Sequence, residues 1–584
     1  MKMRKLPIGV ADFKDMVTGD YYYVDKTLFI KEIIDCGDKI LLIPRPRRFG
    51  KTLNISMLAY FYTCCPITWS PDAELPVPLQ GAQGTQPLHN YSYLFDGLAI
   101  QGTGQKYLDK MGQFPVIFLS LRDVKNETWI SCLNKIKELV QEEYLKHDYL
   151  LDSPLMKPVE KEYYKNIIAL KGTQTNYESS LKKLLVFLSR FYGKRAVILI
   201  DEYDAPALAG FTFGYYEKVI HFIRNFLGGA LKDTDQYLEK GIVTGIMRIT
   251  KESIFSGFNN PGVYTLLAKK FSDCFGFTET EIRIMLEDFQ VIDKLEQVQL
   301  WYNGYLFGGN IIYNPWSIIN FLNDEEKKLK PYWINTSDNQ MVDFLLSKGG
   351  TELRKELEQL VRGDSIEKAI DENIILKDVT RREDLLWSFL LMGGYLKQTD
   401  ERQDDVSGKM YYTLSIPNKE VRLSYTGIIE RYFSTKIENE TLEIMLKALI
   451  EGDIQLFEKM LKQIVLAVFS YHDFGKAPEK VYHALVAGLL IWISNTHEVR
   501  SNRESGYGRY DIMIIPKDVS KIGYVIEFKT VDQDNNETVE AALEAALAQI
   551  ETNKYETEIQ ERGITRIKKL AIAFLGKDVF IKSK

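Results

Sequence analysis

The segment from Lys39 to Thr52 constrains the fold of this chain more than any other. Lys39–Pro44 (KILLIP) is short and apolar, which indicates a buried strand, and RPRRFGKT follows it directly before a helical stretch that starts LNISMLAYFY. A strand joined to a helix by a turn ending in Gly-Lys-Thr is typical of a phosphate-binding loop, because the helix N-terminus presents backbone N–H groups to an anion. The segment therefore predicts a layered α/β domain with a phosphate site where the strand ends.

Several residues of this turn can act on a nucleotide. Gly50 permits close approach of the backbone to phosphate, Lys51 can reach the outer phosphates, and Thr52 can place its hydroxyl on Mg²⁺. Arg48 is a further candidate for binding the nucleotide. Arg45 stands where the consensus has glycine, so a basic, solvated turn between a strand and a helix is the alternative interpretation.

Three more apolar runs indicate further strands of the same sheet: Phe114–Leu121, Ala196–Ile200 and Gly241–Ile246. Continuous apolar runs, in place of alternation, are typical of parallel strands covered by helices on both faces. Amphipathic helical stretches lie between them at Trp129–Leu145 and Tyr177–Tyr192. We therefore expect a parallel sheet of the P-loop NTPase kind.

Two carboxylates follow the run AVILI, which is the Walker B pattern. Asp201 would hold Mg²⁺ beside the phosphate loop, and Glu202 would orient or polarise the attacking water. An acidic cap on an ordinary strand is the alternative, but the two motifs together predict binding of ATP or GTP. Arg248, just after the run GIVTGI, either supplies positive charge to the transition state or forms a structural ion pair at the sheet edge.

A second chemical site is expected near the C-terminus. Asp511 opens the apolar run DIMIIP, and Glu527 and Lys529 end the next run, YVIEFKT. Side chains alternate along a strand, so Glu527 and Lys529 share a face. If the two strands are adjacent, Asp511 and Glu527 form an oxygen-only site suited to Mg²⁺ or Mn²⁺, and Lys529 positions or activates a water for attack on a phosphodiester.

A single Glu-x-Lys pattern is common on solvated strand faces, which is the alternative here. The apolar neighbours in VIEFK indicate a buried strand, where charged groups need a partner such as a metal. Glu504 is a weaker candidate for an extra ligand. Gln549 and Tyr555 either approach the same site or belong to a plain amphipathic helix.

Strings across nearly the whole chain resemble one known architecture. The sequence is similar to the AAA-ATPase-like family whose members carry a C-terminal nuclease domain of the PD-(D/E)XK superfamily. The resemblance rests on LPIGVADFKDMVTGDYYYVDKT, RPRRFGKT, LIDEYDAP, TGIMRITKESIFSGFNN, WYNGYLFGG, YNPWSIINFL, YWINTSDN, GYGRYDIMI and VIEFK. Arg45 belongs to the family's own RPRRFGK form. Asp25 and Lys26, in YYVDKT, match its N-terminal signature with either a structural role or a contact near the nucleotide.

The resemblance implies the roles already assigned to the two sites, with Gln549 and Tyr555 similar to an accessory motif. The change of periodicity along the chain, together with the resemblance, predicts three parts: a P-loop AAA-ATPase-like domain over 1–277, a helical middle region over 278–478, and a small α/β restriction-endonuclease-like domain over 479–584. The Pro-, Gly- and Gln-rich segment at about 64–90 is expected to be an insertion. Within the middle region, only Tyr411–Ile416 indicates a strand.

Charge and composition limit the functions available. With 74 Lys and Arg against 80 Asp and Glu, the net charge of −6 excludes a generally basic nucleic-acid coat, although Arg500, Arg503 and Arg509 give local positive charge. Five cysteines without CxxC spacing argue against structural zinc and for a reducing interior. The apolar stretch Ala484–Ile493 is too short to cross a bilayer, and the N-terminus lacks a secretory pattern, so we expect a cytoplasmic protein with no membrane contact.

Two functional hypotheses follow. The first is an ATP-binding protein, an ATPase, coupled to a metal-dependent nuclease that cleaves phosphodiester bonds in nucleic acid, with DNA favoured over RNA. The second is a nucleotide-sensing regulatory or interaction protein whose nuclease-like domain binds nucleic acid or a partner without cleaving. A kinase-like phosphotransferase is disfavoured because no acceptor-site motif is visible. Self-association into a homo-oligomer is left open.

Overall fold

The computed structural model describes residues 4–64, 91–249, 261–333, 351–373, 376, 383–423, 425, 439–468, 486, 488–493, 496–501, 504–505, 508–531 and 537–584. The chain forms two compact units, Met1–Met341 with Glu367–Val421, and Val342–Ile366 with Arg422–Lys584. The expected insertion at about 64–90 lies outside the described residues except for Cys64. No helix in the described part of the chain combines the length and apolar character needed to cross a membrane.

A five-stranded parallel sheet organises the first unit, as the sequence predicts. Its order is β2 (Val116–Ser120), β3 (Ala196–Asp201), β4 (Leu238–Gly245), β1 (Ile40–Pro44) and β5 (Gly262–Val263), and each neighbouring pair is parallel. Strands β1 and β3 are buried along their whole length. Because β4 lies between them, three strand ends meet at the edge that carries the phosphate loop.

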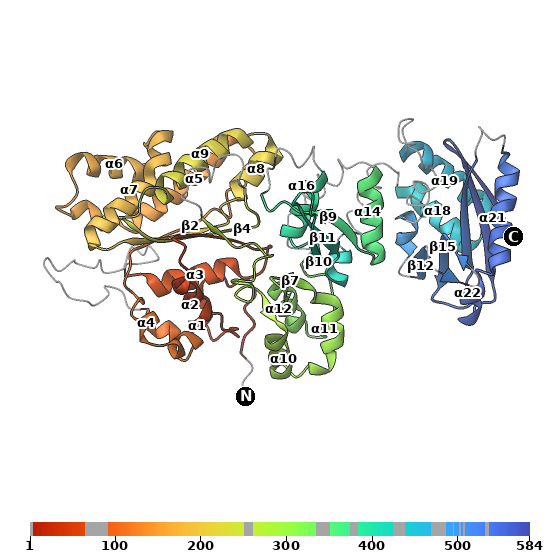
Figure 1. Ribbon diagram of the computed structural model, residues 1–584, viewed down its shortest axis with the longest axis horizontal. Helices are drawn as coiled ribbons and strands as arrows, with labels where there is room; N and C mark the ends of the chain where they lie inside the picture. The colour runs from red at the N-terminus through yellow and green to blue at the C-terminus, as the bar shows by residue number, and fades with distance from the viewer. Residues whose placement is uncertain are drawn as a thin grey trace. The chain divides into compact units, whose positions relative to one another are not determined.

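Helices cover both faces of this sheet (Figure 1). On one face lie α1 (Phe13–Thr18), α2 (Leu28–Asp35) and α3 (Lys51–Tyr62), and on the other α5 (Trp129–Leu145), α6 (Pro158–Ile168), α7 (Gln174–Tyr192), α8 (Ala205–Phe213) and α9 (Tyr216–Leu231). The short elements η1 (Ser92–Phe95), η2 (Ala99–Thr103), α4 (Gln105–Leu108) and η3 (Asp148–Asp152) complete the connections. The predicted helix Trp129–Leu145 has the bounds of α5, and Tyr177–Tyr192 falls within α7.

The remainder of the first unit is richer in strands than the sequence predicts. Its helices are α10 (Glu279–Asp288), η4 (Ile292–Lys294), α11 (Leu295–Tyr302), α12 (Pro315–Asn323) and α16 (Glu383–Met392). Two three-stranded sheets accompany them, β6 (Phe277–Thr278), β8 (Asn310–Tyr313) and β7 (Tyr305–Phe307), and β10 (Lys397–Gln403), β11 (Met410–Ser415) and β9 (Ile366–Ala369). Strand β11 is the expected one. The others are short or, like β10, largely exposed, so no apolar run marks them.

The second unit contains α14 (Thr351–Arg362), α18 (Asn439–Glu451) and α19 (Ile454–Val468) and a five-stranded sheet. The sheet order is β12 (His497–Ser501), β15 (Ile512–Pro516), β16 (Gly523–Thr530), β17 (Ile567–Leu575) and β18 (Asp578–Ser583). Only the β16–β17 pair is parallel among these strands, and α21 (Val539–Asn553) and α22 (Thr557–Glu561) connect the two. Short β13 (Glu504–Ser505) and β14 (Gly508–Arg509) pair with each other, and η6 (Ile491–Ile493) precedes β12.

Helices cover both faces of this second sheet (Figure 1), and hydrophobic cores lie beneath them. Helices α18 and α19 pack on one face through residues such as Leu442 of α18 and Phe457 of α19, against Phe528 of the sheet. Helix α21 packs on the other face through small residues including Ala542 and Ala546. A mixed sheet covered by helices on both faces confirms the predicted small α/β domain.

Candidate active sites

The phosphate loop runs from β1 into α3, and backbone carbonyl oxygens of the loop bind the side chain of Lys51. Gly50 has a φ of 82°, a left-handed conformation that glycine adopts without strain. The ammonium of Lys51 donates to the carbonyl oxygens of Arg45 (3.0 Å) and Pro46 (2.9 Å). Burial lowers the pKa of Lys51, while the nearby carboxylates of Glu202 and Asp201 act in the opposite direction. Because its direct partners are neutral carbonyls, the loop leaves the charge of Lys51 available to an anion.

The contacts of the Arg45 side chain explain how the loop accommodates an arginine in place of glycine. The side chain is fully buried, and its guanidinium donates to the carbonyl oxygens of Pro44 (2.8 Å), Tyr264 (2.7 Å) and Phe271 (2.8 Å). It also lies over the ring of Phe275. Arg45 therefore points away from the nucleotide position and ties the loop to the segment after β5.

Asp201 meets the hydroxyl of Thr52 at the edge of the sheet. Thr52 Oγ1 donates to Asp201 Oδ2 at 2.7 Å, and Thr244 Oγ1, at the end of β4, donates to Asp201 Oδ1 at 2.8 Å. Burial and the charge of Glu202 raise the pKa of Asp201, whereas the bonds from Thr52 and Thr244 oppose this. A hydroxyl and a carboxylate oxygen in contact form the oxygen-only donor set that Mg²⁺ prefers, so these residues fit that ion.

The chain turns sharply after Asp201. Glu202 has a φ of 50°, which is unusual for a residue other than glycine and places a half-buried carboxylate just beyond the strand. Asp204 is fully buried and accepts from the backbone N–H groups of Ile246 (2.8 Å) and Met247 (3.1 Å). Burial raises the pKa of Asp204 to about 6. Sequence analysis missed Asp204 and Thr244; the second aspartate of LIDEYDAP was the available signal.

The two arginines predicted for this site differ in their surroundings. The guanidinium of Arg48 stacks on Trp316 of α12, 4.4 Å from the ring centroid, so it faces the region after the P-loop domain. Arg248 follows Met247 beyond β4, and within the described residues it forms no ion pair. In the described part of the chain, Arg248 therefore does not form the structural ion pair that was the alternative interpretation.

The second site forms where β15, β16 and α21 meet. Ile512 pairs with Ile526 in the antiparallel register, which brings Asp511 next to the end of β16, and Asp511 Oδ2 accepts from the N–H of Phe528 at 2.8 Å. Glu527 is buried, with 2% of its surface exposed, and Lys529 Nζ lies 4.0 Å from Glu527 Oε1.

Gln549 of α21 joins the two charged residues of β16. Its amide nitrogen donates to Glu527, and its amide oxygen accepts from Lys529 Nζ at 2.9 Å. The carboxylates of Asp511 and Glu527 supply oxygen donors that fit Mg²⁺ or Mn²⁺. The structure therefore gathers four of the residues that the sequence analysis associated with this site.

Comparison with known proteins identifies the families that two parts of the chain match. A model of the family described as predicted AAA-ATPase matches residues 7–66 and 86–255, and a model of the PD-(D/E)XK nuclease superfamily matches residues 477–584. The chain thus carries a predicted AAA-ATPase domain and a C-terminal PD-(D/E)XK nuclease superfamily domain. It is also 25% identical over 548 residues to a protein of Azotobacter chroococcum mcd 1 named "Uncharacterized protein in vnfD 5'region", covering 91% of this chain and 90% of that one.

The N-terminal signature of the AAA-ATPase-like domain makes structural contacts. Asp25 accepts from the N–H groups of Thr27 (2.8 Å) and Ala99 (2.6 Å). Lys26 Nζ donates to the carbonyl oxygen of Asp273 (2.8 Å) and to Glu281 (2.7 Å). These bonds join the N-terminal segment to η2 and to the start of α10.

The other residues predicted for the nuclease superfamily domain make no contact with this site among the interactions that the structure describes. Tyr555 is buried against the ring of Tyr510, with centroids 6.1 Å apart, and its hydroxyl accepts from Asn553. Glu504 and Arg509 lie on β13 and β14, but their side chains, like Arg503, fall outside the description. Arg500 pairs with Glu498 (2.7 Å) and with Glu558. The local positive charge expected from Arg500 is therefore neutralised by neighbouring carboxylates.

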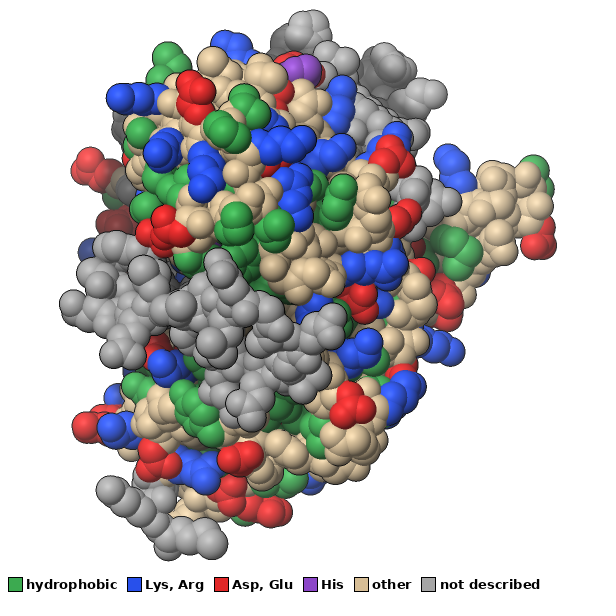
Figure 2. All heavy atoms as spheres, turned by 90° about the vertical axis from the view of Figure 1, so that its left-hand side faces the viewer, with side chains coloured by type: hydrophobic (Ala, Val, Ile, Leu, Met, Phe, Trp, Pro, Cys, Tyr) green, Lys and Arg blue, Asp and Glu red, His purple; other side chains and the backbone are tan. Residues whose placement is uncertain are grey.

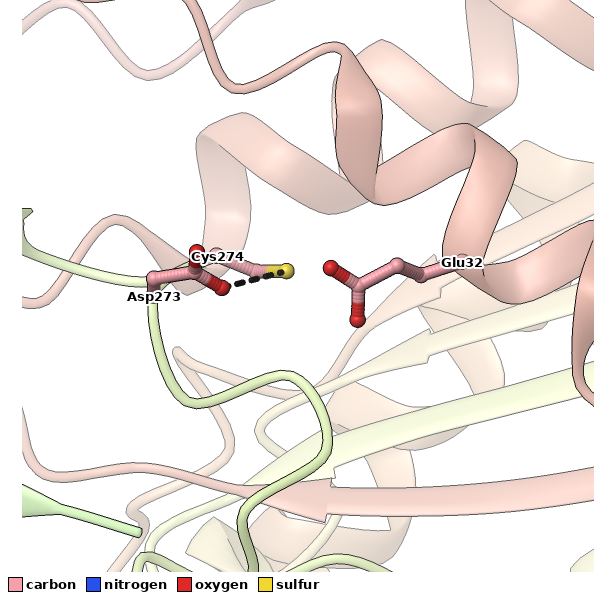
Figure 3. Close-up of side chains that lie close together, drawn as sticks. All are labelled: Glu32, Asp273 and Cys274. Atoms are coloured by element: carbon pink, nitrogen blue, oxygen red, sulfur yellow. Dashed lines mark hydrogen bonds between the residues drawn. The ribbon is translucent and has the colours of Figure 1, made fainter. Parts of the chain in front are cut away.

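A third group of close side chains was not expected from the sequence. Glu32, Asp273 and Cys274 have ligand-type atoms within 4.8 Å of one another, beside α2 (Figure 3). Burial and the charge of Asp273 raise the pKa of Glu32, and burial raises the pKa of Cys274 well above its ordinary value. Cys274 Sγ donates to Asp273 Oδ1 at 3.8 Å. The protonated thiol of Cys274 thus has its hydrogen-bond acceptor within the group. We interpret the three side chains as a polar packing contact.

Proposed function

We propose that this protein binds and hydrolyses ATP in its first unit and that this activity is coupled to a metal-dependent nuclease in its second unit. The contact between Thr52 Oγ1 and Asp201 Oδ2, at 2.7 Å next to the buried Lys51, carries the ATP part of the proposal. Lys51 would bind the outer phosphates, with Gly50 and Arg48 lining the loop. Thr52 and Asp201 would hold Mg²⁺, which supplies charge neutralisation when bound, and Glu202 would orient the water.

The nuclease part rests on the assembly of Asp511, Glu527 and Lys529 at adjacent strand ends. Asp511 and Glu527 would hold a divalent metal, Mg²⁺ or Mn²⁺, which supplies Lewis-acid activation of a phosphodiester when bound. Lys529, held by Gln549, would orient the attacking water and stabilise negative charge beside it. Polynucleotide is therefore the proposed substrate, with DNA ahead of RNA.

Contacts within the first unit support the proposed coupling. Besides Arg48 on Trp316, the loop residue Phe49 packs edge-on against Tyr305 of β7, with ring centroids 4.9 Å apart. The residues that would respond to a nucleotide are therefore packed against elements outside the P-loop sheet. We propose that nucleotide occupancy changes these contacts and, through the chain that leads to the second unit, controls cleavage.

The parts are assigned as 1–277 for the ATPase-like domain, 278–478 for the middle region and 479–584 for the nuclease-like domain. Cys36, Cys64, Cys132 and Cys274 are free thiols, which supports a reducing compartment such as the cytoplasm. Assembly into a homo-oligomer is compatible with the proposal and is measured by light scattering.

One observation favours the second hypothesis, a protein that senses nucleotide and binds without cleaving. Arg500 is neutralised by Glu498 and Glu558, so it adds little attraction for a phosphate backbone. On the face of the first unit shown in Figure 2, basic, acidic and apolar side chains are interspersed. Binding without cleavage therefore stays the competing function, and the same assay distinguishes the two.

The test is cleavage of single- and double-stranded DNA and RNA with Mg²⁺ or Mn²⁺. Wild type is compared with Glu527→Gln, which keeps the side-chain shape but removes a ligand charge. Glu544→Gln, on the exposed side of α21, is the matched control. We expect cleavage by wild type and the control, and loss of at least about 100-fold in Glu527→Gln. Absence of cleavage by wild type on every substrate, with nucleic-acid binding retained, would establish the competing function.

A further inference from the structure

Arg122 stands at the same edge of the sheet as the phosphate loop. Ser120, the last residue of β2, pairs with Asp201, and the N–H of Leu121 donates to the carbonyl oxygen of Asp201 at 2.9 Å. The fully buried Val124 anchors the turn that follows, where its N–H donates to Leu121 at 3.1 Å. The backbone of Arg122 is therefore fixed next to the Walker B aspartate.

The guanidinium of Arg122 reaches across to the phosphate loop. Its Nη2 donates to Thr52 Oγ1 at 3.4 Å, the hydroxyl that also contacts Asp201. The side chain is exposed, and within the described residues it pairs with no carboxylate. The charge of Arg122 thus faces solvent at the point where a nucleotide phosphate would lie.

Further positive charge gathers at the same place. Burial lowers the pKa of Arg48, and the charges of Arg122 and Arg47 lower it further, while the carboxylate of Glu202 opposes them. The charge of Arg47 also acts to lower the pKa of Lys51. Like charges held this close repel one another unless an anion binds among them. A polyphosphate is the anion whose several negative charges match this arrangement.

We propose that Arg122 is a nucleotide-binding residue that contacts the outermost phosphate of ATP and stabilises the charge that develops there during hydrolysis. This inference rests on the proposed ATPase function and adds a residue to it. Arg248 was the candidate that the sequence suggested for this charge, but Arg122 is the arginine that touches Thr52.

The chemistry explains why this position matters. In hydrolysis, a water oxygen bonds to the γ-phosphorus, and the bond from that phosphorus to the β–γ bridging oxygen breaks. The electron pair of the broken bond stays on ADP, and the proton lost from the water passes to solvent by way of Glu202. Negative charge is spread over the γ-phosphate oxygens in the transition state, where a fixed guanidinium stabilises it.

The experiment measures binding of ATP and ADP, each with Mg²⁺, by calorimetry, together with steady-state ATP hydrolysis. Arg122→Ala is compared with wild type, with Arg122→Lys and with Lys125→Ala, which removes the same charge from an exposed position of the same loop. We expect Arg122→Ala to weaken ATP binding by about 10-fold or more, leave ADP binding within about 3-fold, and lower kcat by at least about 100-fold. Arg122→Lys should retain much of the ATP affinity, and Lys125→Ala should behave as wild type.

Several outcomes overturn the inference. Arg122→Ala matching Lys125→Ala in both measurements would remove Arg122 from the site while leaving the ATPase proposal intact. Equal weakening of ATP and ADP would exclude contact with the outermost phosphate. Failure of wild type itself to bind ATP would refute the proposed function, and the inference with it. If thermal unfolding shows Arg122→Ala to be misfolded, Arg122→Gln replaces it, because it removes the charge and keeps much of the side-chain length: loss of hydrolysis with ADP binding retained supports the inference, and wild-type hydrolysis contradicts it.

Discussion

The two candidate sites hold their lysines in opposite ways. Lys51 is bound by carbonyl oxygens of its own loop, five and six residues back in the chain, whereas Lys529 is bound by Gln549, which lies on a separate helix. The phosphate loop of the first site is thus built from one continuous segment. The second requires β15, β16 and α21 to be packed before its charged groups are oriented. Local sequence therefore determines the phosphate loop, whereas tertiary packing determines the carboxylate–lysine site.

The largest expected effect comes from the lysine of the locally built site. Lys51→Ala should lower ATP hydrolysis on the order of 10²- to 10³-fold, because it removes the charge next to the outer phosphates. The fold of the loop should survive, since Arg45 still binds the carbonyls of Tyr264 and Phe271. Hydrolysis and thermal unfolding are measured together. Unchanged hydrolysis in Lys51→Ala would contradict the assignment of this loop as a phosphate-binding site.

The second prediction concerns the pH dependence of stability that arises from the raised pKa of Asp204. Asp204 has a pKa of about 6 in the folded protein, above the roughly 3.9 of an unfolded chain. The folded state therefore keeps a proton between those values that the unfolded state has lost. The stability from this group is full below about pH 4 and is lost as the pH rises through about 6.

Asp204→Asn, which does not titrate, provides the comparison. Relative to this variant, the free energy of unfolding of wild type should fall by up to about 3 kcal/mol between pH 4 and pH 7. Urea unfolding at several pH values measures it. Parallel pH profiles for the two proteins would show that burial does not perturb Asp204.

The third prediction concerns the distributed site. Gln549→Leu should reduce metal-dependent cleavage by about 10- to 100-fold, because Lys529 and Glu527 lose the amide that orients both. The pH profile of cleavage should shift as well, which a merely structural role would not produce. Gln560→Leu, on the exposed surface of α22, is the control. Wild-type cleavage and pH profile in Gln549→Leu would mean that β16 alone orients the lysine.

The smallest effect is expected where the phosphate loop touches α12. Trp316→Leu removes the stacking of Arg48 and the hydrogen bond from Trp316 Nε1 to the carbonyl oxygen of Tyr332 (3.2 Å), and should cost about 1–2 kcal/mol of stability. Trp301→Leu is matched, because Lys419 stacks on Trp301 at the same 4.4 Å but away from the loop. ATP affinity should change in Trp316→Leu and stay constant in Trp301→Leu. Equal ATP affinities in the two variants would show that the Arg48–Trp316 contact is unconnected to the nucleotide.

The same comparison explains how much the sequence could predict. The parallel sheet and the meeting of Thr52 with Asp201 were predictable because each motif is local and parallel strands end at one edge. Asp511 beside Glu527 followed from two apolar strands that are close in the chain. These are features that periodicity and spacing encode directly.

Other features depend on packing between distant segments. The contact of Arg122 with Thr52 spans 70 residues, and the stacking of Arg48 on Trp316 links the loop to α12. Arg500 was expected to attract nucleic acid, but Glu558, far along the chain, neutralises it. Exposed strands such as β10 carry no apolar run and so were not foreseen. Sequence patterns do not specify which side chains meet across such distances.

Coupling between the two sites is the central claim, and one measurement tests it most directly. The cleavage rate of nucleic acid is followed with Mg²⁺ in wild type and in Lys51→Ala, each with and without ATP. We expect ATP to change cleavage by wild type and to have no effect on Lys51→Ala, while Glu527→Gln is inactive throughout. Cleavage that is the same in wild type and Lys51→Ala, with or without ATP, would contradict the coupling and leave two independent activities on one chain.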